Sequence, residues 1–313
     1  MSNINMTGWP ALTDEARAVV LECVDTLARE AAGDGRDPAV VFEAAEPFGR
    51  AFAAYRGAAF QARVTRYEAA GGAIVHLIEP PIGCSLCLIE TGNELAMIDS
   101  GFACCREELL SVVRGVVPKY DGLHKTMLLT HADIDHCGLA DLADEVWMSR
   151  KCHKAFASEA AGGPNLRELD VVQGAYERMI KRLSGYATPP LSKMRAIGGT
   201  LEKYEPALTH IGDVAVGDLR FEAWEGRGGH VAGECVFLER AQRIAFTGDV
   251  FCNLKALTPE QAAFNALSPR LLGSVDADKA TANEERRAIF DLLSGGAWQV
   301  FGGHGGVKLW EGA

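Results

Sequence analysis

The sequence predicts an α/β fold built in layers, because strand, loop, helix and strand signals alternate along most of the chain. The chain has 313 residues, enough for one large domain or for a domain with an appendage. Several short apolar runs of strand length end directly in His or Asp. Loops at the end of a rigid sheet can aim such side chains at a common point, so the same pattern predicts a functional site at one edge of the fold.

The first part of the chain predicts a helical extension over residues 1–62, before a main domain at 63–313. Residues 13–32 carry apolar side chains at helical spacing. Residues 38–60 predict a second pair of helices, which we expect Pro47 to interrupt. The extension could cover a sheet edge, form a homodimer contact or act as a lid, and the sequence does not choose among these.

The main domain carries the alternating elements. We expect strands at 73–79, 84–90, 94–98, 126–130, 145–149, 234–239, 243–247 and 298–301, and helices at 104–115, 138–145 and 283–294. The strands at 234–239 and 243–247 are close enough to form a hairpin. Between them and the first strands, residues 152–203 are rich in Ala, Arg, Leu and Lys and predict an inserted helical cap over the site.

Composition narrows the choice of partner and compartment. The chain is 48% hydrophobic and 23% charged, with a net charge of −11, which disfavours nucleic acid and anionic membranes as partners. No signal peptide is visible, and no apolar run approaches the ~18 residues of a membrane span. Nine cysteines without an export signal indicate free thiols in a reducing compartment. We therefore expect a cytoplasmic protein that acts on a small molecule.

The segment Thr130–His136 is the densest group of chemically active side chains. His131, Asp133, Asp135 and His136 follow an apolar run, so a buried strand ends in imidazoles and carboxylates. Unpaired buried charge is expensive, which indicates that these side chains bind something. Imidazole and carboxylate together suit zinc, iron or manganese.

Three later segments supply further candidate ligands. His230 stands in the glycine-rich turn 229–233, Asp249 follows the apolar run Ile244–Phe246, and His304 follows Trp298–Phe301. Glycine beside a ligand lets the backbone approach a metal ion closely.

In this order, the motifs resemble the metallo-β-lactamase superfamily. Its pattern is H-x-H-x-D-H, then a His in a glycine-rich turn, an Asp after a strand and a C-terminal His. Asp99, within Met97–Gly101, is similar to the early D-[ST]-G of that family. The resemblance covers the chain from about residue 73 to residue 310. It implies an αββα sandwich of two mixed β-sheets flanked by helices, with the ligands on loops at one edge.

The resemblance also implies two divalent metal ions, zinc first, with iron or manganese as alternatives. The first ion would be held by His131, Asp133 and His230, the second by Asp135, His136 and His304, with Asp249 bridging both. It further implies a metallo-hydrolase in which a metal-bound hydroxide attacks an ester, thioester, lactone or phosphoester. Asp135, or Asp99 behind it, would orient the water or relay a proton.

Asp133 departs from the pattern, because the family usually has His at this position. A carboxylate here is more similar to the diiron flavoprotein branch, which carries Glu, and motivates a second function as a redox protein acting on oxygen, peroxide or nitric oxide. The chain has no G-x-G-x-x-G cofactor loop to support that function. A short Asp133 could also leave only the second metal position filled. A third alternative is a metal-binding module without catalysis.

Overall fold

The computed structural model describes residues 4–199 and 206–312, and within these ranges two mixed β-sheets form the centre of the molecule. The first sheet contains, in spatial order, β1 (Arg63–Glu68), β2 (Ile74–Glu79), β3 (Leu86–Thr91), β4 (Glu94–Ile98), β5 (His124–Leu128), β6 (Glu145–Ser149) and β7 (Met194–Ile197). Strands β1 to β4 pair antiparallel, and β4 to β7 pair parallel. The parallel strands therefore end at one common edge.

The second sheet is built from the C-terminal half of the chain. Its spatial order is β13 (Lys308–Trp310), β12 (Trp298–Phe301), β11 (Ile244–Phe246), β10 (Cys235–Glu239), β9 (Leu219–Gly226) and β8 (Leu208–Val216). Only β11 and β12 pair parallel, and the remaining neighbours are antiparallel. The hairpin expected near 234–247 is present as β10 and β11.

The two sheets pack face to face through an apolar layer. Leu77 and Ile89 of the first sheet meet Phe221, Phe237 and Phe246 of the second, and all five are fully buried. Alternate residues on each strand point to the outer faces, where helices cover them.

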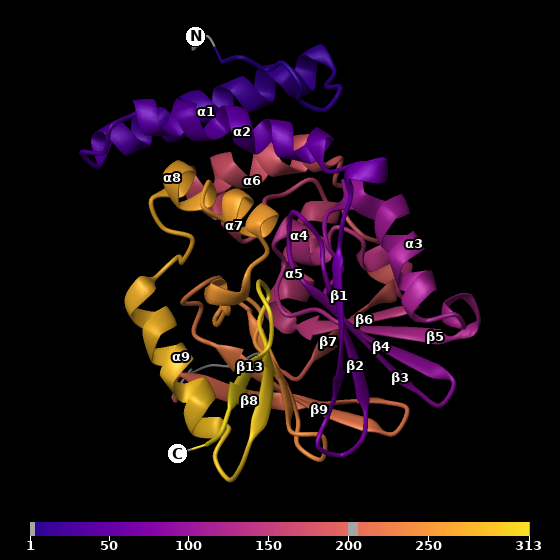
Figure 1. Cartoon of the computed structure of the whole chain (residues 1–313). Helices are drawn as coiled ribbons and strands as arrows, with labels where there is room; N and C mark the ends of the chain where they lie inside the picture. Colours follow the sequence, from indigo (N-terminus) through magenta and orange to yellow (C-terminus); the bar gives the residue numbers. More distant parts are fainter. Residues whose placement is uncertain (1–3, 200–205, 313) are drawn as a thin grey trace.

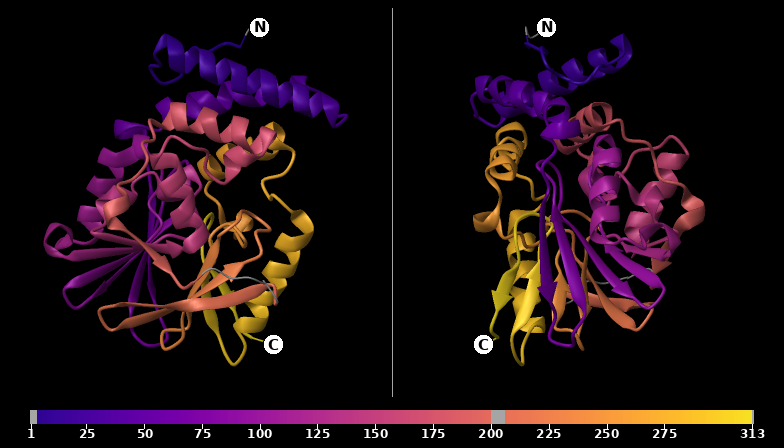
Figure 2. Two further views of the ribbon diagram at one scale, coloured as in Figure 1. Left: turned by 180° about the vertical axis from the view of Figure 1, so that it is seen from behind. Right: turned by 45° about the vertical axis from the view of Figure 1, so that its right-hand side comes forward.

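The outer face of the first sheet carries α3 (Arg106–Val116), α4 (Ile134–Cys137) and α5 (Arg150–Ala160), and that of the second sheet carries α9 (Lys279–Leu292) (Figure 1; Figure 2). Helix α6 (Val171–Ser184) lies at one end of the sandwich and contacts α4. The expected αββα sandwich is confirmed.

The N-terminal helices lie across one end of the sandwich, beside α6, α7 (Pro259–Asn265) and α8 (Ser268–Leu272) (Figure 1). They are α1 (Asp14–Gly33) and α2 (Ala39–Ala54). Phe48 of α2 stacks on Phe264 with 5.1 Å between ring centroids and contacts Tyr176 at 5.5 Å. The extension therefore shares its core with the helices of the main domain.

Two local expectations need correction. Pro47 lies inside the continuous helix α2 and does not divide it. Packing of one fully buried face, including Val41 and Phe48, outweighs the one backbone hydrogen bond that proline removes. The helix expected at 138–145 instead begins at Ile134 and ends at Cys137, followed by a short 3₁₀ turn.

The segment 152–203 is only partly a helical cap. It includes β7, which extends the first sheet, and α5 packs against β6 and β7 as part of the outer helical layer. Residues 200–203 of this expected cap lie outside the described residues. Sequence patterns also missed β1, β8, β9, β13, α7 and α8. Within the described ranges, each helix is too short or too polar to cross a lipid bilayer.

Candidate metal centre

Four segments bring the predicted ligands to the edge where the parallel strands end. The loop after β5 carries His131 and Asp133, and α4 carries the next two candidates, Asp135 and His136. The remaining three, His230, Asp249 and His304, follow β9, β11 and β12. Asp133 begins α4 with an extended backbone, so the chain turns between the two pairs of ligands.

The seven side chains converge in two overlapping groups. In the first group, Asp133 Oδ2 lies 3.4 Å from His131 Nε2 and 3.4 Å from His230 Nε2. In the second, His304 Nε2 lies 3.4 Å from Asp135 Oδ2 and 3.3 Å from Asp249 Oδ2. Asp249 also approaches His136 Nε2 at 3.3 Å and His230 Nε2 at 3.7 Å, so it stands between the groups.

Two buried nitrogen atoms show that the donor set suits a metal ion. His131 Nε2 and His136 Nε2 have no hydrogen-bond partner, although both imidazoles are fully buried. Their other ring nitrogens are engaged, with His131 Nδ1 3.0 Å from Thr130 Oγ1 and His136 Nδ1 2.9 Å from Asp99 Oδ2. Buried polar atoms are normally paired, and a cation among these nitrogens and carboxylates would satisfy them.

Asp99 lies behind His136, away from the cavity described below. It accepts hydrogen bonds from the Thr130 amide and hydroxyl, both at 2.8 Å, and from His136 Nδ1. Its φ of 57° is unusual for a residue other than glycine. A carboxylate only accepts hydrogen bonds, so this contact places the His136 proton on Nδ1 and turns the Nε2 lone pair toward the ligand cluster.

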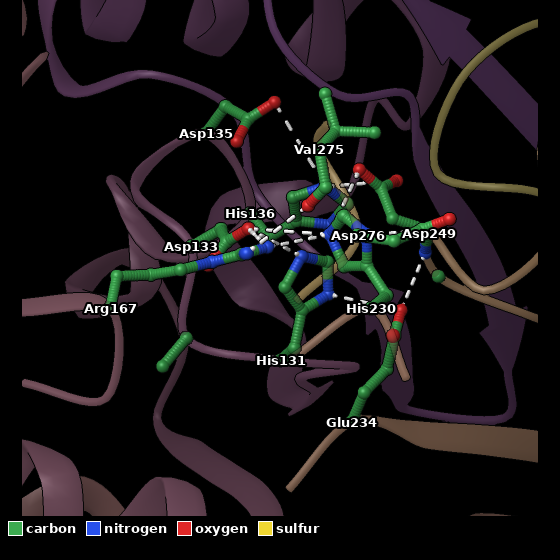
Figure 3. A network of polar contacts seen from close by, with 12 residues as sticks. His131, Asp133, Asp135, His136, Arg167, His230, Glu234, Asp249, Val275 and Asp276 are labelled. Atoms are coloured by element: carbon green, nitrogen blue, oxygen red, sulfur yellow. Dashed lines mark hydrogen bonds and ion pairs between the residues drawn. The ribbon is translucent and has the colours of Figure 1, made fainter. Parts of the chain in front are cut away.

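Arg167 is a member of the site that the sequence patterns missed. It begins a 3₁₀ turn between α5 and α6, and its side chain reaches the first group of ligands (Figure 3). Its Nε donates to Asp133 Oδ1 at 2.9 Å and its Nη2 to Asp133 Oδ2 at 2.6 Å. Burial disfavours the Asp133 charge, but the Arg167 guanidinium and His131 outweigh it and hold the pKa of that carboxyl well below its usual range. No motif surrounds Arg167, so local sequence offered no signal for it.

Two further carboxylates, those of Asp276 and Glu234, form hydrogen bonds with the candidate ligand residues. Asp276 Oδ1 lies 3.2 Å from His230 Nδ1 and is itself paired with Arg286 at 3.0 Å. Glu234 is buried, and it accepts hydrogen bonds from the amides of Asp249 at 2.6 Å and Val250 at 3.0 Å. No sequence pattern marks Asp276 or Glu234 either, because each acts through contacts with residues distant in the chain.

The electrostatic field of the cluster favours cations. Burial opposes a charge on His136, yet neighbouring acidic groups, including Asp249 and Asp135, raise the pKa of this imidazole well above its usual range. Burial likewise opposes the charge on Asp249, but His304 and His136 hold the pKa of its carboxyl well below the usual range. The raised pKa of His136 reflects the negative potential of the neighbouring carboxylates, which a divalent cation in the same place would also experience.

A cavity of about 640 Å³ opens beside the cluster. Its polar wall holds Asp133, Asp135, Arg167, His230, Asp249, Asp276, Arg286 and His304. The rest of the lining is largely apolar and includes Phe102, Ile134, Tyr176, Ile180, Phe251, Leu257, Phe264 and Leu272. Both arginines of the lining are paired with aspartates, so the cavity combines a metal-type cluster with an apolar surface and has no unpaired arginine among the described residues of its lining.

Comparisons with known proteins give one family match and several similar solved structures. The family model described as the metallo-beta-lactamase superfamily matches residues 80–304. A metallo-beta-lactamase from Pontibacter korlensis is 18% identical, with 80% of this chain and 94% of that chain covered and a TM-score of 0.48. The Rm3 metallo-beta-lactamase is 16% identical, covering 74% and 75% with a TM-score of 0.45.

A flavoprotein from Thermotoga maritima is 13% identical, covering 79% of this chain and 57% of that chain with a TM-score of 0.48. No curated protein sequence matches this chain.

Proposed function

The chain belongs to the metallo-β-lactamase superfamily, and from that premise we propose that it is a metal-dependent hydrolase of neutral acyl compounds, namely esters, thioesters or lactones with a large apolar part. The observation that carries the proposal is the buried, unpartnered nitrogen His136 Nε2, which lies 3.3 Å from Asp249 Oδ1, because Asp249 lines the cavity.

The residues that would hold a metal ion are those of the second group, together with Asp249. Asp135, His136 and His304 place their ligand atoms within 4.8 Å of one another. A bound divalent ion would polarise a carbonyl oxygen and lower the pKa of a water molecule, so no nucleophilic side chain is needed.

Within this proposal the chain's own residues have separate tasks. Asp135 lines the cavity and offers a carboxylate oxygen that can accept a proton from an attacking water. Asp99 is a positioning residue, because it contacts His136 Nδ1 and Thr130 but is not part of the cavity lining. The apolar wall excludes bulk water from the reacting bond.

The lining of the cavity favours an apolar acyl group over a phosphoester. Arg167 and Arg286 are each paired with a carboxylate and are not free to bind an added anion. The aromatic rings of Tyr176 and Phe264 form part of the cavity lining and pack on Phe48 of α2, so the N-terminal extension supports the pocket. A volume of about 640 Å³ is sufficient for a ligand of moderate size.

The test combines metal analysis with a substrate series. Protein purified without added metal should contain zinc, iron or manganese, and should hydrolyse p-nitrophenyl esters with rates that rise with acyl length from two to about eight carbons. A chelator should abolish turnover, and the metal should restore it. His304→Ala should lose activity, whereas His210→Ala, at an exposed position of β8, is the matched control and should keep it. Chelated protein that hydrolyses esters at an undiminished rate would contradict the proposal.

The redox alternative depended on Asp133 as an iron ligand. In this fold both oxygens of Asp133 accept hydrogen bonds from Arg167, so the carboxylate is paired with a guanidinium and need not bind iron. No other observation favours that function, so we do not carry it further.

A further inference from the structure

Arg167 occupies a complete hydrogen-bonding site within the first group of ligands. A guanidinium has five N–H donors, and all five are used. Nε and Nη2 donate to the two oxygens of Asp133, and Nη2 also contacts His230 Nε2 at 2.8 Å. Nη1 donates to Gln173 Oε1 at 2.9 Å and to the Val275 carbonyl at 3.2 Å. The side chain is 8% exposed, so it is held on every side rather than resting loosely on the surface of the cavity.

The position of Nη2 coincides with that of an ion held by Asp133 and His230. These two ligand atoms are 3.4 Å apart, and Nη2 lies 2.6 Å and 2.8 Å from them. Zinc would lie at about 2.0–2.2 Å from each. An ion on the same side of these two atoms as the guanidinium would then lie about 1 Å from Nη2. An ion on the far side would still lie only about 3 Å from Nη2.

Both positions conflict with the guanidinium. The first overlaps with Nη2. The second places two like charges in contact in a buried site, which is strongly unfavourable. In addition, His230 Nε2 has a single in-plane bonding direction, and Arg167 already uses it.

The identity of residue 133 fits the same interpretation. An aspartate accepts two parallel N–H bonds from a guanidinium, as it does here, whereas an imidazole offers one acceptor at most. The charges also balance, because Asp133 cancels Arg167, while Asp135 and Asp249 cancel one divalent ion. A second divalent ion would leave two uncancelled positive charges in the buried cluster.

We propose that the Arg167 guanidinium replaces the metal ion of the first position, so that the chain binds a single metal ion at Asp135, His136, Asp249 and His304. Arg167 is then a positioning residue that fixes Asp133 and His230, and its charge is balanced by Asp133. The inference rests on the metal site of the proposed function, but not on the hydrolytic reaction or on the substrate class.

The test counts metal ions. Metal-free protein is titrated with Co²⁺, and the visible absorption and the dialysed metal content are both followed. The expected result for the unchanged protein is saturation at one equivalent. The double variant Arg167→Ala with Asp133→His should saturate at two equivalents, because it frees His230 and restores an imidazole. Arg286→Ala, which removes the other arginine of the cavity lining, is the matched control and should remain at one.

Two outcomes would overturn the inference. One is the uptake of two tightly bound equivalents by the unchanged protein, a result that leaves the proposed hydrolase function standing and does not depend on any variant folding. The other is a folded double variant, checked by circular dichroism, that still saturates at one equivalent. If the unchanged protein binds no Co²⁺, Zn²⁺, Fe²⁺ or Mn²⁺ at all, the metal site of the proposed function fails, and the inference fails with it.

Discussion

Replacing Asp99 by Asn tests how the fold prepares His136 for a metal ion. The Asp99 carboxylate accepts from His136 Nδ1 at 2.9 Å, which leaves the Nε2 lone pair free. Asp99 Oδ1 accepts from the Thr130 amide, and Oδ2 accepts from the Thr130 hydroxyl as well as from His136 Nδ1. In Asp99→Asn the amide oxygen would keep the bond from the Thr130 amide, and the NH₂ group would face Nδ1 and the Thr130 hydroxyl, which can accept a hydrogen bond. The imidazole would then carry its proton on Nε2, where a metal ion cannot bind.

The magnitude follows from the cost of losing such an orienting partner, which is typically 10- to 100-fold in metal affinity, or about 1.4–2.7 kcal/mol. Asparagine tolerates the positive φ of this position, so backbone strain is not the cause of the loss. The assay is competition between the protein and a metal-binding dye for Zn²⁺. Asp99→Asn should show a dissociation constant 10- to 100-fold above that of the unchanged protein.

Ser100→Ala is the matched control for this change. The buried Ser100 hydroxyl donates to the His136 carbonyl at 2.8 Å and accepts from the Leu139 amide at 3.0 Å. Its loss should lower the free energy of unfolding by about 1–3 kcal/mol without changing the ring tautomer or the metal affinity. The reasoning is refuted if Asp99→Asn binds Zn²⁺ within twofold of the unchanged protein, or if Ser100→Ala weakens binding equally.

Three further changes test other parts of the molecule. Gly303→Ala would place a methyl group against Asp249 Oδ1, so Zn²⁺ affinity in the same dye assay should fall at least tenfold. Gly115 has open space around it, so Gly115→Ala should leave the Zn²⁺ affinity unchanged. Burial, reinforced by Asp133, raises the pKa of Glu177 to about 8, so the folded state prefers the protonated acid. The loss of folding stability caused by ionising Glu177 is absent below pH about 4.5 and grows up to pH about 8. Above that pH it levels off, on the order of a few kcal/mol. Glu177→Gln should therefore raise the melting temperature by several degrees at pH 8.5 and hardly at all at pH 5, and an equal effect at both values would contradict the assignment. Chelation of the metal should lower the melting temperature at neutral pH, because an ion at 100 times its dissociation constant stabilises the folded state by about 2.7 kcal/mol. Identical melting curves with and without chelator would show that the cluster holds no ion.

Local patterns in the chain were enough to predict the layered fold and the set of side chains that meet at its edge. Strands at 94–98, 145–149 and 298–301 form with the bounds expected from their apolar patterns. His131 and His304 lie far apart in the chain, yet each follows a strand whose end lies at the same edge. Local periodicity decides which residues form strands, and a ligand placed directly after a strand inherits the position of that strand.

The surroundings of those ligands depend on contacts between distant segments. Arg167 comes from a segment without a motif, and its contacts with Asp133, His230 and Gln173 exist only after the helices pack on the sheet. Pro47 stays within a helix for the same reason, since a buried helix face compensates for a weak local preference. Hydrogen bonds and burial between distant segments leave no periodic trace in the sequence, so the charge balance of the site becomes visible only in the folded chain.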